Sequence, residues 1–230
     1  MVNKSMRASE FWLTSCALLI MLVGLLVSYG FSISCDHVTL DDFSVSHCVD
    51  SPSLVASWVG RLGLTLGPVM LCAVEFMRPS RSFPCPRTRR FLATVVSVFL
   101  VATAHAPVHQ MRRLHFLFAF GFFFSMGIYM LSLVLLLGSP ALAGFLALQA
   151  VAMGALYVGW KRSHSSEKGA RFRSTLFSTA ELCCVGIFSI FILILGMGPT
   201  TFRRWDVDIL GCAPIPRADC VCPRWTDMGP

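Results

Sequence analysis

Long apolar runs separated by short polar segments dominate the hydrophobic pattern of this chain. Six runs are each continuous enough to form one helix, and they cover residues 11–33, 54–76, 91–107, 114–137, 140–160 and 174–198. A helix rises ~1.5 Å per residue, so ~20 apolar residues cross the ~30 Å hydrocarbon core of a bilayer. Only the run 91–107 is shorter than this. The pattern predicts an all-α polytopic membrane protein: a single bundle of six transmembrane helices in 1–198, followed by a short Pro/Cys-containing tail at 199–230.

Composition agrees with a membrane protein and disfavours other classes. Hydrophobic residues make up 55% of the chain and charged residues only 13%, against ~25% charged in soluble domains. The net charge is +7, but the basic residues lie between the apolar runs and no basic-aromatic motif accompanies them. We therefore expect no nucleic-acid partner. The sequence also lacks a Walker loop, an HExxH motif and a G-x-S-x-G motif, which are common catalytic signatures.

The charged segments between the runs predict the topology. Segment 34–53 contains four aspartates and no Lys or Arg, whereas 77–90 contains five arginines. The positive-inside rule therefore places 77–90 in the cytosol and 34–53 outside or in a lumen, and with six spans both termini and the tail are cytosolic. Segment 161–173, with five basic residues, disagrees. It is either a tolerated exception or a sign that the short run 91–107 does not cross.

The first run follows Lys4 and Arg7, as the apolar core of a signal peptide would. It is longer than the ~7–15 residues of such a core, and no A-x-A site follows it. We expect a retained anchor, with cleavage before Cys35 as the alternative.

The cysteines divide by location. Cys35 and Cys48 share the predicted lumenal segment, where a disulfide or two free thiols are both open. The tail cysteines, Cys212, Cys220 and Cys222, are expected to be free thiols or, next, acylated. Their spacing matches no standard zinc pattern, and no metal site or cofactor is predicted.

Ionisable side chains within the runs are the best functional clue, because each costs ~2.5–3.5 kcal/mol at the centre of a membrane helix. Under the predicted topology Arg61, His105, His115 and Glu181 all fall in the lumenal half. One interpretation is a polar pocket that binds a lipid head group, with Arg61 and Glu181 as each other's nearest partner. The alternative is a buried ion pair that fixes helix packing. Glu75 is interpreted as a terminal ion pair with Arg78 that reaches water.

Two further patterns concern packing. A G-x-x-x-G from Gly63 to Gly67 predicts a close approach between helices. The aromatic run 116–124 is expected to face lipid.

Three stretches carry a resemblance to a known family. They are the acidic loop from Ile33 to Ser53, the histidine-led fourth run at His115, and the basic segment followed by Ser178-Thr179-Ala180-Glu181. Together with six spans they resemble the Frag/DRAM/Sfk family, which includes the damage-regulated autophagy modulators and the amino-terminal domain of yeast glycosylphosphatidylinositol-lipid remodelling factors. The resemblance implies an endomembrane or plasma-membrane protein concerned with lipids, in remodelling of the GPI anchor lipid or in lipid distribution and autophagy.

The sequence therefore predicts a lipid-handling membrane protein, accessory rather than enzymatic, in the Golgi/ER or lysosomal membrane or at the cell surface. Its expected partners are membrane lipids and other membrane proteins. A membrane-embedded acyl-transfer enzyme using His115 as base is the first alternative, although no activated nucleophile accompanies the histidine. A small transporter or channel subunit is the second, although no internal repeat is visible.

Overall fold

The computed structural model describes residues 4–35, 45, 54–78, 85–163 and 170–197. Nearly all of this part of the chain is helical, and it contains no strand. Its helices are α1 (Lys4–Ser34), α3 (Leu54–Met77), α4 (Pro86–His105), α5 (Val108–Leu137), α6 (Pro140–Ser163) and α7 (Ala170–Gly196). The predicted tail 199–230 lies outside the described residues.

Five of these helices are long and apolar enough to cross a membrane, so the chain is an integral, multi-pass membrane protein. Their apolar parts are Ser9–Ser34, Leu54–Met77, Gln110–Leu137, Pro140–Gly159 and Leu176–Gly196. Helix α4 is not among them; it corresponds to the run that the sequence marked as short, and three arginines lie in its first turns. It nevertheless packs against both α3 and α5 and is a full member of the bundle.

Four helices, α1, α4, α5 and α7, begin earlier than the apolar pattern predicts, and the starts of α4 and α5 bear on the site. Helix α4 starts at Pro86, where the fixed φ of proline suits a first helical position. Helix α5 starts at Val108, so His109 and the arginines that follow lie in its first turns and not in a loop. Met111 has non-helical dihedrals (φ −127°, ψ 41°), which kink α5 between these turns and the apolar body.

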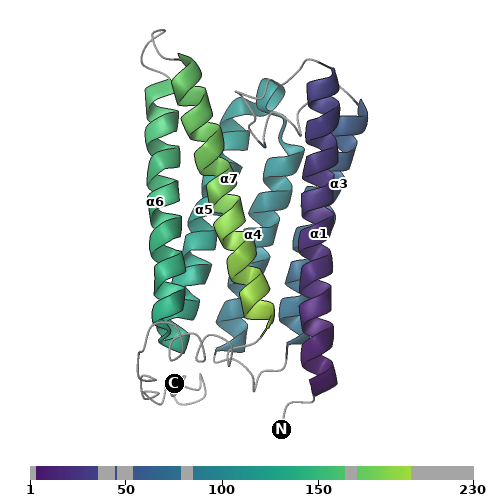
Figure 1. Cartoon of the computed structure of the whole chain (residues 1–230), viewed down its shortest axis with the longest axis vertical. Helices are drawn as coiled ribbons and strands as arrows, with labels where there is room; N and C mark the ends of the chain where they lie inside the picture. The colour runs from purple at the N-terminus through teal and green to yellow at the C-terminus, as the bar shows by residue number, and fades with distance from the viewer. Residues whose placement is uncertain (1–3, 36–44, 46–53, 79–84, 164–169, 198–230) are drawn as a thin grey trace, which may run out of the picture.

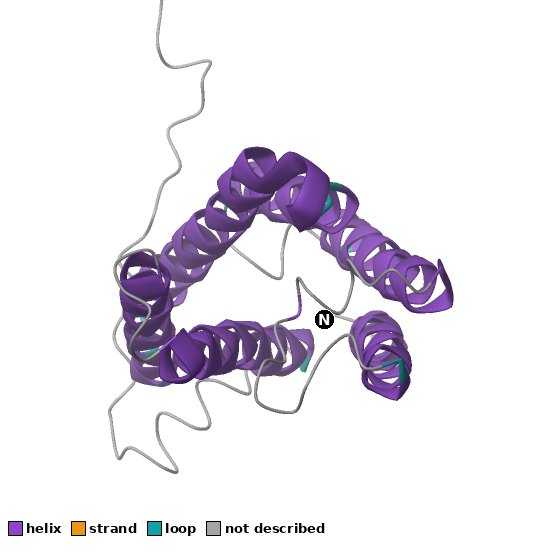
Figure 2. Cartoon of the chain, turned by 90° about the horizontal axis from the view of Figure 1, so that it is seen from above, coloured by secondary structure: helices purple, strands orange, loops and turns teal. Residues whose placement is uncertain are grey.

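The helices form a ring in chain order, each packed against the next (Figures 1 and 2). Successive helices alternate in direction, so α1 begins and α7 ends at the same end of the bundle (Figure 1). Contact between α1 and α7 closes the ring and is the least extensive of the contacts between neighbours. At that joint, the position of a Cβ on Gly196 would lie 3.3 Å from the Thr14 side chain.

Helices α1 and α3 form the most intimate pair. A Cβ on Gly24 would lie only 2.9 Å from the Gly63 Cα, and a Cβ on Gly67 would lie 2.9 Å from the carbonyl oxygen of Ala17. The absence of side chains therefore lets the two backbones touch. The close approach predicted from Gly63 and Gly67 is confirmed, and Gly24 is its partner.

The main core lies between α5, α6 and α7 and is built from large apolar side chains such as Met126, Leu133, Leu142 and Phe191. The aromatic run divides: Phe124 is exposed at 67%, but Phe122 is buried at 3% and belongs to this core. The expectation that the whole run faces lipid is wrong for Phe122 and for Phe123, which is buried at 6% in the same core. A helix turns ~100° per residue, so only part of such a run can face lipid.

The structure shows the state of a cysteine that the sequence left open and adds a disulfide-bonded cysteine for which the sequence made no prediction. Cys35 is an exposed free thiol at the end of α1. Of the two alternatives for Cys35, disulfide or free thiol, the structure therefore has the free thiol. Cys48 lies outside the described residues. Cys85, which caps α4, is disulfide-bonded. The other five described cysteines are free.

Candidate functional site: a cavity with two charged ends

A narrow cavity of about 90 Å³ runs through the ring, and among the described residues it is lined by α1, α3, α4, α5 and α7 together with Val45. Helix α3 shows most clearly how the sequence builds it. Side chains at Arg61, Leu64, Pro68, Leu71, Glu75 and Arg78 all line the cavity. Their spacing alternates between three and four residues, which is one face of a helix. This face is charged at both ends and apolar in between.

The first of these ends, the Arg61 end, brings together Arg61, His115 and Glu181 from α3, α5 and α7. Arg61 is partly buried, whereas His115 and Glu181 are exposed at only 4% and 7%. The Glu181 Oε2 accepts a hydrogen bond of 3.1 Å from the backbone N–H of Val45. Three of the four predicted site residues therefore share one cavity end, although they are far apart in sequence. Direct pairing of Arg61 with Glu181 stays a prediction.

His115 is held by the turn between α4 and α5. Its Nδ1 lies 2.7 Å from the carbonyl oxygen of Ala106, the residue after α4. Because a carbonyl oxygen can only accept, Nδ1 carries the proton, and Nε2 is the acceptor in the neutral ring. This contact fixes the orientation of the imidazole and also satisfies a carbonyl at the helix end.

His105, the fourth predicted site residue, does not belong to this site. Its side chain is exposed and is not among those that line the cavity. Its Nε2 lies 3.0 Å from the Thr65 hydroxyl, which itself donates to the Arg61 carbonyl oxygen at 2.7 Å. The prediction placed His105 at the correct level of the bundle but on the wrong face of α4, because depth in the membrane does not determine rotation about the helix axis.

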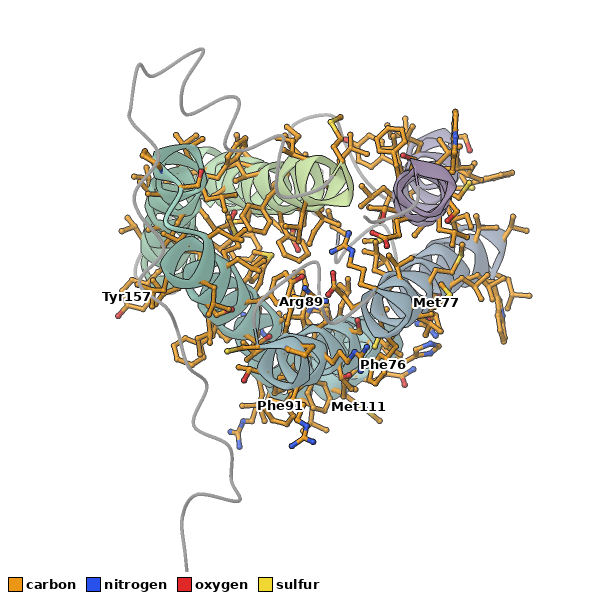
Figure 3. The ribbon with its side chains drawn as sticks, turned by 90° about the horizontal axis from the view of Figure 1, so that it is seen from below. Phe76, Met77, Arg89, Phe91, Met111 and Tyr157 are labelled. Atoms are coloured by element: carbon orange, nitrogen blue, oxygen red, sulfur yellow. The ribbon has the colours of Figure 1, made fainter. Side chains whose placement is uncertain are left out.

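The other end of the cavity, the Glu75 end, holds a cluster of four charged side chains: Glu10, Glu75, Arg78 and Arg89, called here the charge cluster. Glu75 pairs with Arg78 one turn away and with the Arg89 Nε at 2.6 Å. Arg78 Nε also lies 3.6 Å from Glu10 Oε2. Arg89 and Arg78 are exposed at 0% and 2%, and Arg89 points into the middle of the ring, while Phe91 and Tyr157 point outwards (Figure 3).

Glu75 was predicted to pair with Arg78, which is confirmed. The prediction that it reaches water is wrong, since Glu75 is only 6% exposed. The reason is that α1, α4 and α5 close over it: Glu10 and Arg89 join the pair, and the Tyr129 hydroxyl lies beside the same carboxylate. The sequence offered one signal for this cluster, the spacing of Glu75 and Arg78 at the end of a run, but nothing in the linear pattern linked them to Glu10 or Tyr129.

Arg90 closes the end of α3. Its guanidinium donates to the carbonyl oxygens of Glu75, Phe76 and Arg78 at 3.4, 2.9 and 3.3 Å. Such carbonyls have no partner within their own helix, and a cation there also complements the helix dipole. Arg78, Arg89 and Arg90 thus all have structural partners within the bundle.

No protein-family model, curated protein or solved structure matches this chain. The structural support for a function therefore comes from the fold and from the geometry of the cavity. Among the described residues, no group of three His, Cys, Asp or Glu side chains is placed to hold a metal ion.

Proposed function

We propose that this protein binds the head group of a membrane lipid at the Arg61 end and handles that lipid without altering it. The observation that supports this most strongly is the meeting of Arg61, His115 and Glu181 at one end of a cavity whose middle is apolar. A guanidinium binds phosphate oxygens well, in a bidentate manner. His115 and Glu181 would orient the head group, and the apolar middle suits a hydrocarbon chain.

The backbone contacts at the Arg61 end support binding. Glu181 accepts from a backbone N–H and His115 donates to a backbone carbonyl, so a backbone group helps to orient each side chain. Groups held in this way are pre-organised for a ligand, which lowers the entropic cost of binding.

On the resemblance to the Frag/DRAM/Sfk family, this role is accessory to GPI-lipid remodelling or to lipid distribution and autophagy in a Golgi/ER, lysosomal or plasma membrane. No family match supports the resemblance, so organelle location of a tagged copy is its direct test. A tagged copy confined to mitochondria would contradict it.

A photolabelling experiment tests the binding. The full chain is reconstituted in nanodiscs with a phosphatidic acid analogue that carries a diazirine beside its head group. We expect Arg61→Ala to lower labelling about tenfold or more, the usual loss for a hydrogen bond to a charged group. Arg113→Ala is the matched control, because Arg113 is an exposed arginine at the start of α5. Equal labelling of Arg61→Ala and the wild-type protein would refute the proposal.

The same system separates binding from catalysis. If the protein were an acyl-transfer enzyme with His115 Nε2 as base, His115→Ala would abolish turnover and retain binding, whereas our proposal expects His115→Ala and Glu181→Gln both to weaken binding. Thermal unfolding of each variant shows whether the loss of the contact between His115 and Ala106 has disturbed the fold instead.

The topology that we propose has six spans, with α4 crossing between α3 and α5 and both termini in the cytosol. Lys4, Arg7 and Arg203 flank the first and last apolar runs and favour this orientation. We expect a protease site inserted in 164–169 to be protected in sealed vesicles of cytosol-side-out orientation. Cleavage there would mean either that α4 does not cross or that the orientation is reversed. Only the reversed orientation would place Cys85 in an oxidising compartment, where disulfides persist.

A further inference from the structure

We infer that the charge cluster is the floor of a channel for a single acyl chain, and that its distance from Arg61 sets the chain length the protein prefers. The inference rests on the proposed function, because the head group must sit at the Arg61 end. It adds the occupant of the remaining cavity: one hydrocarbon chain beneath a phosphate-bearing head.

The length of the channel follows from α3. Arg61 and Glu75 lie on the same face of this helix, and a rise of ~1.5 Å per residue separates them by ~21 Å. This is more than half of the ~30 Å hydrocarbon core, so it exceeds the depth of one leaflet. A chain that begins beside Arg61 can therefore extend fully before it meets Glu75.

The walls between the two ends are apolar. They are lined by Leu18 and Met21 from α1, Leu64 and Leu71 from α3, and Val185 and Phe188 from α7. A cavity volume of about 90 Å³ spread over this length is narrow, so a single slender chain must displace the apolar side chains that line it, and a pair side by side does not fit. A free single-chain amphiphile and a diacyl lipid that leaves its second chain in the bilayer both present this chemistry.

The floor is polar, and that makes it a stop. Glu75, Arg78 and Tyr129 line the cavity there, beside the hydroxyl of Thr14, which is 0% exposed. Moving the terminal methyl group of a chain into contact with buried charges is unfavourable. The methyl group would displace polar neighbours of these charges and cannot form a hydrogen bond in their place. Affinity should therefore rise with chain length only until the chain reaches this level.

Two positions just above the floor allow the depth to be changed. Ala93 lies one turn beyond Arg89 on α4, and Ile192 lies one turn before Gly196 on α7; both side chains line the cavity. Ala93→Phe fills the lower channel, whereas Ile192→Ala extends it. Val98→Phe and Ile190→Ala are matched controls on the same two helices, since Val98 and Ile190 are exposed at 60% and 51%.

The test is a competition series in nanodiscs with alkyl phosphates of graded chain length, displacing the photoreactive phosphatidic acid analogue. For the wild-type protein we expect affinity to rise about fourfold per methylene, the value of one buried CH₂, and then to level off. Ala93→Phe should level off at a shorter chain and Ile192→Ala at a longer one, with both controls unchanged. Unchanged chain-length profiles in Ala93→Phe and Ile192→Ala would overturn the inference.

A second readout needs no substitution. A diazirine at the end of the chain of the best-bound probe should label residues around Thr14 and Ile192, and labelling confined to lipid-facing positions would also overturn the inference. A diacyl analogue with the diazirine on one chain, tested in parallel, should give the same pattern if the second chain remains outside. Failure of the proposed function looks different, because labelling would then be independent of Arg61 for every probe. If binding depends on Arg61 but not on chain length, the proposed head-group site is retained and only the proposed acyl-chain channel is refuted.

Discussion

The two ends of the cavity use the same residue types in opposite ways. At the Glu75 end, acidic and basic side chains pair with one another across α1, α3 and α4, and Glu75, Arg78 and Arg89 are almost completely buried. At the Arg61 end, Glu181 and His115 each have one hydrogen bond with a backbone group, and Arg61 remains partly exposed. Burial and mutual pairing favour a structural role for the Glu75 end, whereas the partial exposure of Arg61 leaves one charge of the other end accessible, as our proposed function requires.

The largest expected effect breaks the Glu75 end. Arg89→Ala should lower the free energy of unfolding by about 3 kcal/mol, the low end of the range for breaking a buried ion pair, because the buried Glu75 carboxylate then keeps only Arg78 as a partner. Steric-trap or SDS unfolding in bicelles measures this value. Arg87→Ala is the control, since Arg87 is exposed two positions earlier on α4 and should change stability by less than about 0.5 kcal/mol. Equal values for both variants would show that the charge cluster has no structural role.

An intermediate effect on stability is expected where α1 packs against α3. Gly24→Ala places a Cβ 2.9 Å from the Gly63 Cα and must separate α1 from α3. We expect a loss of about 1–3 kcal/mol, the usual cost of overpacking. Gly30→Ala on the same helix meets nothing within 4 Å and should not destabilise the protein. If both substitutions have the same effect in thermal unfolding, the close approach of α1 and α3 does not exist.

Substitution at the Arg61 end should affect lipid binding strongly and stability only weakly, in contrast to substitution at the Glu75 end. Arg61→Ala should change the free energy of unfolding by no more than about 1 kcal/mol, because ion pairs of partly exposed side chains contribute little. The same substitution should remove most lipid labelling. Suppose instead that Arg61→Ala strongly destabilises the protein and that the fraction that remains folded is labelled normally. Both ends of the cavity would then have a structural role, and the contrast between them would be refuted.

The smallest effect is expected at His105, which lies at the depth of Arg61 but outside the cavity. His105→Ala removes one hydrogen bond to Thr65 at an exposed position, so stability should change by less than about 0.5 kcal/mol and lipid labelling should not change. Reduced labelling in this variant would place His105 in the site after all.

Most of the Arg61 end could be predicted from the sequence, and most of the Glu75 end could not. A charged residue within an apolar run is conspicuous, so Arg61, His115 and Glu181 stood out. Glu10 and Arg89 were not conspicuous, because they lie among other polar residues at the ends of helices, where charges usually meet water. Only the closure of the ring over these helix ends distinguishes a buried arginine from its exposed neighbours.

The sequence by itself determined that this chain forms long helices in a membrane and that α3 has one face charged at both ends. Hydrophobic length and helical period are local properties, so they are legible along the chain. The tertiary structure alone decided which charges meet, because pairing depends on how far each helix is rotated about its axis and on contacts between α1, α4 and α5. That rotation turned His105 outwards and Arg89 inwards, and it divided one set of charged residues between the Arg61 end and the charge cluster.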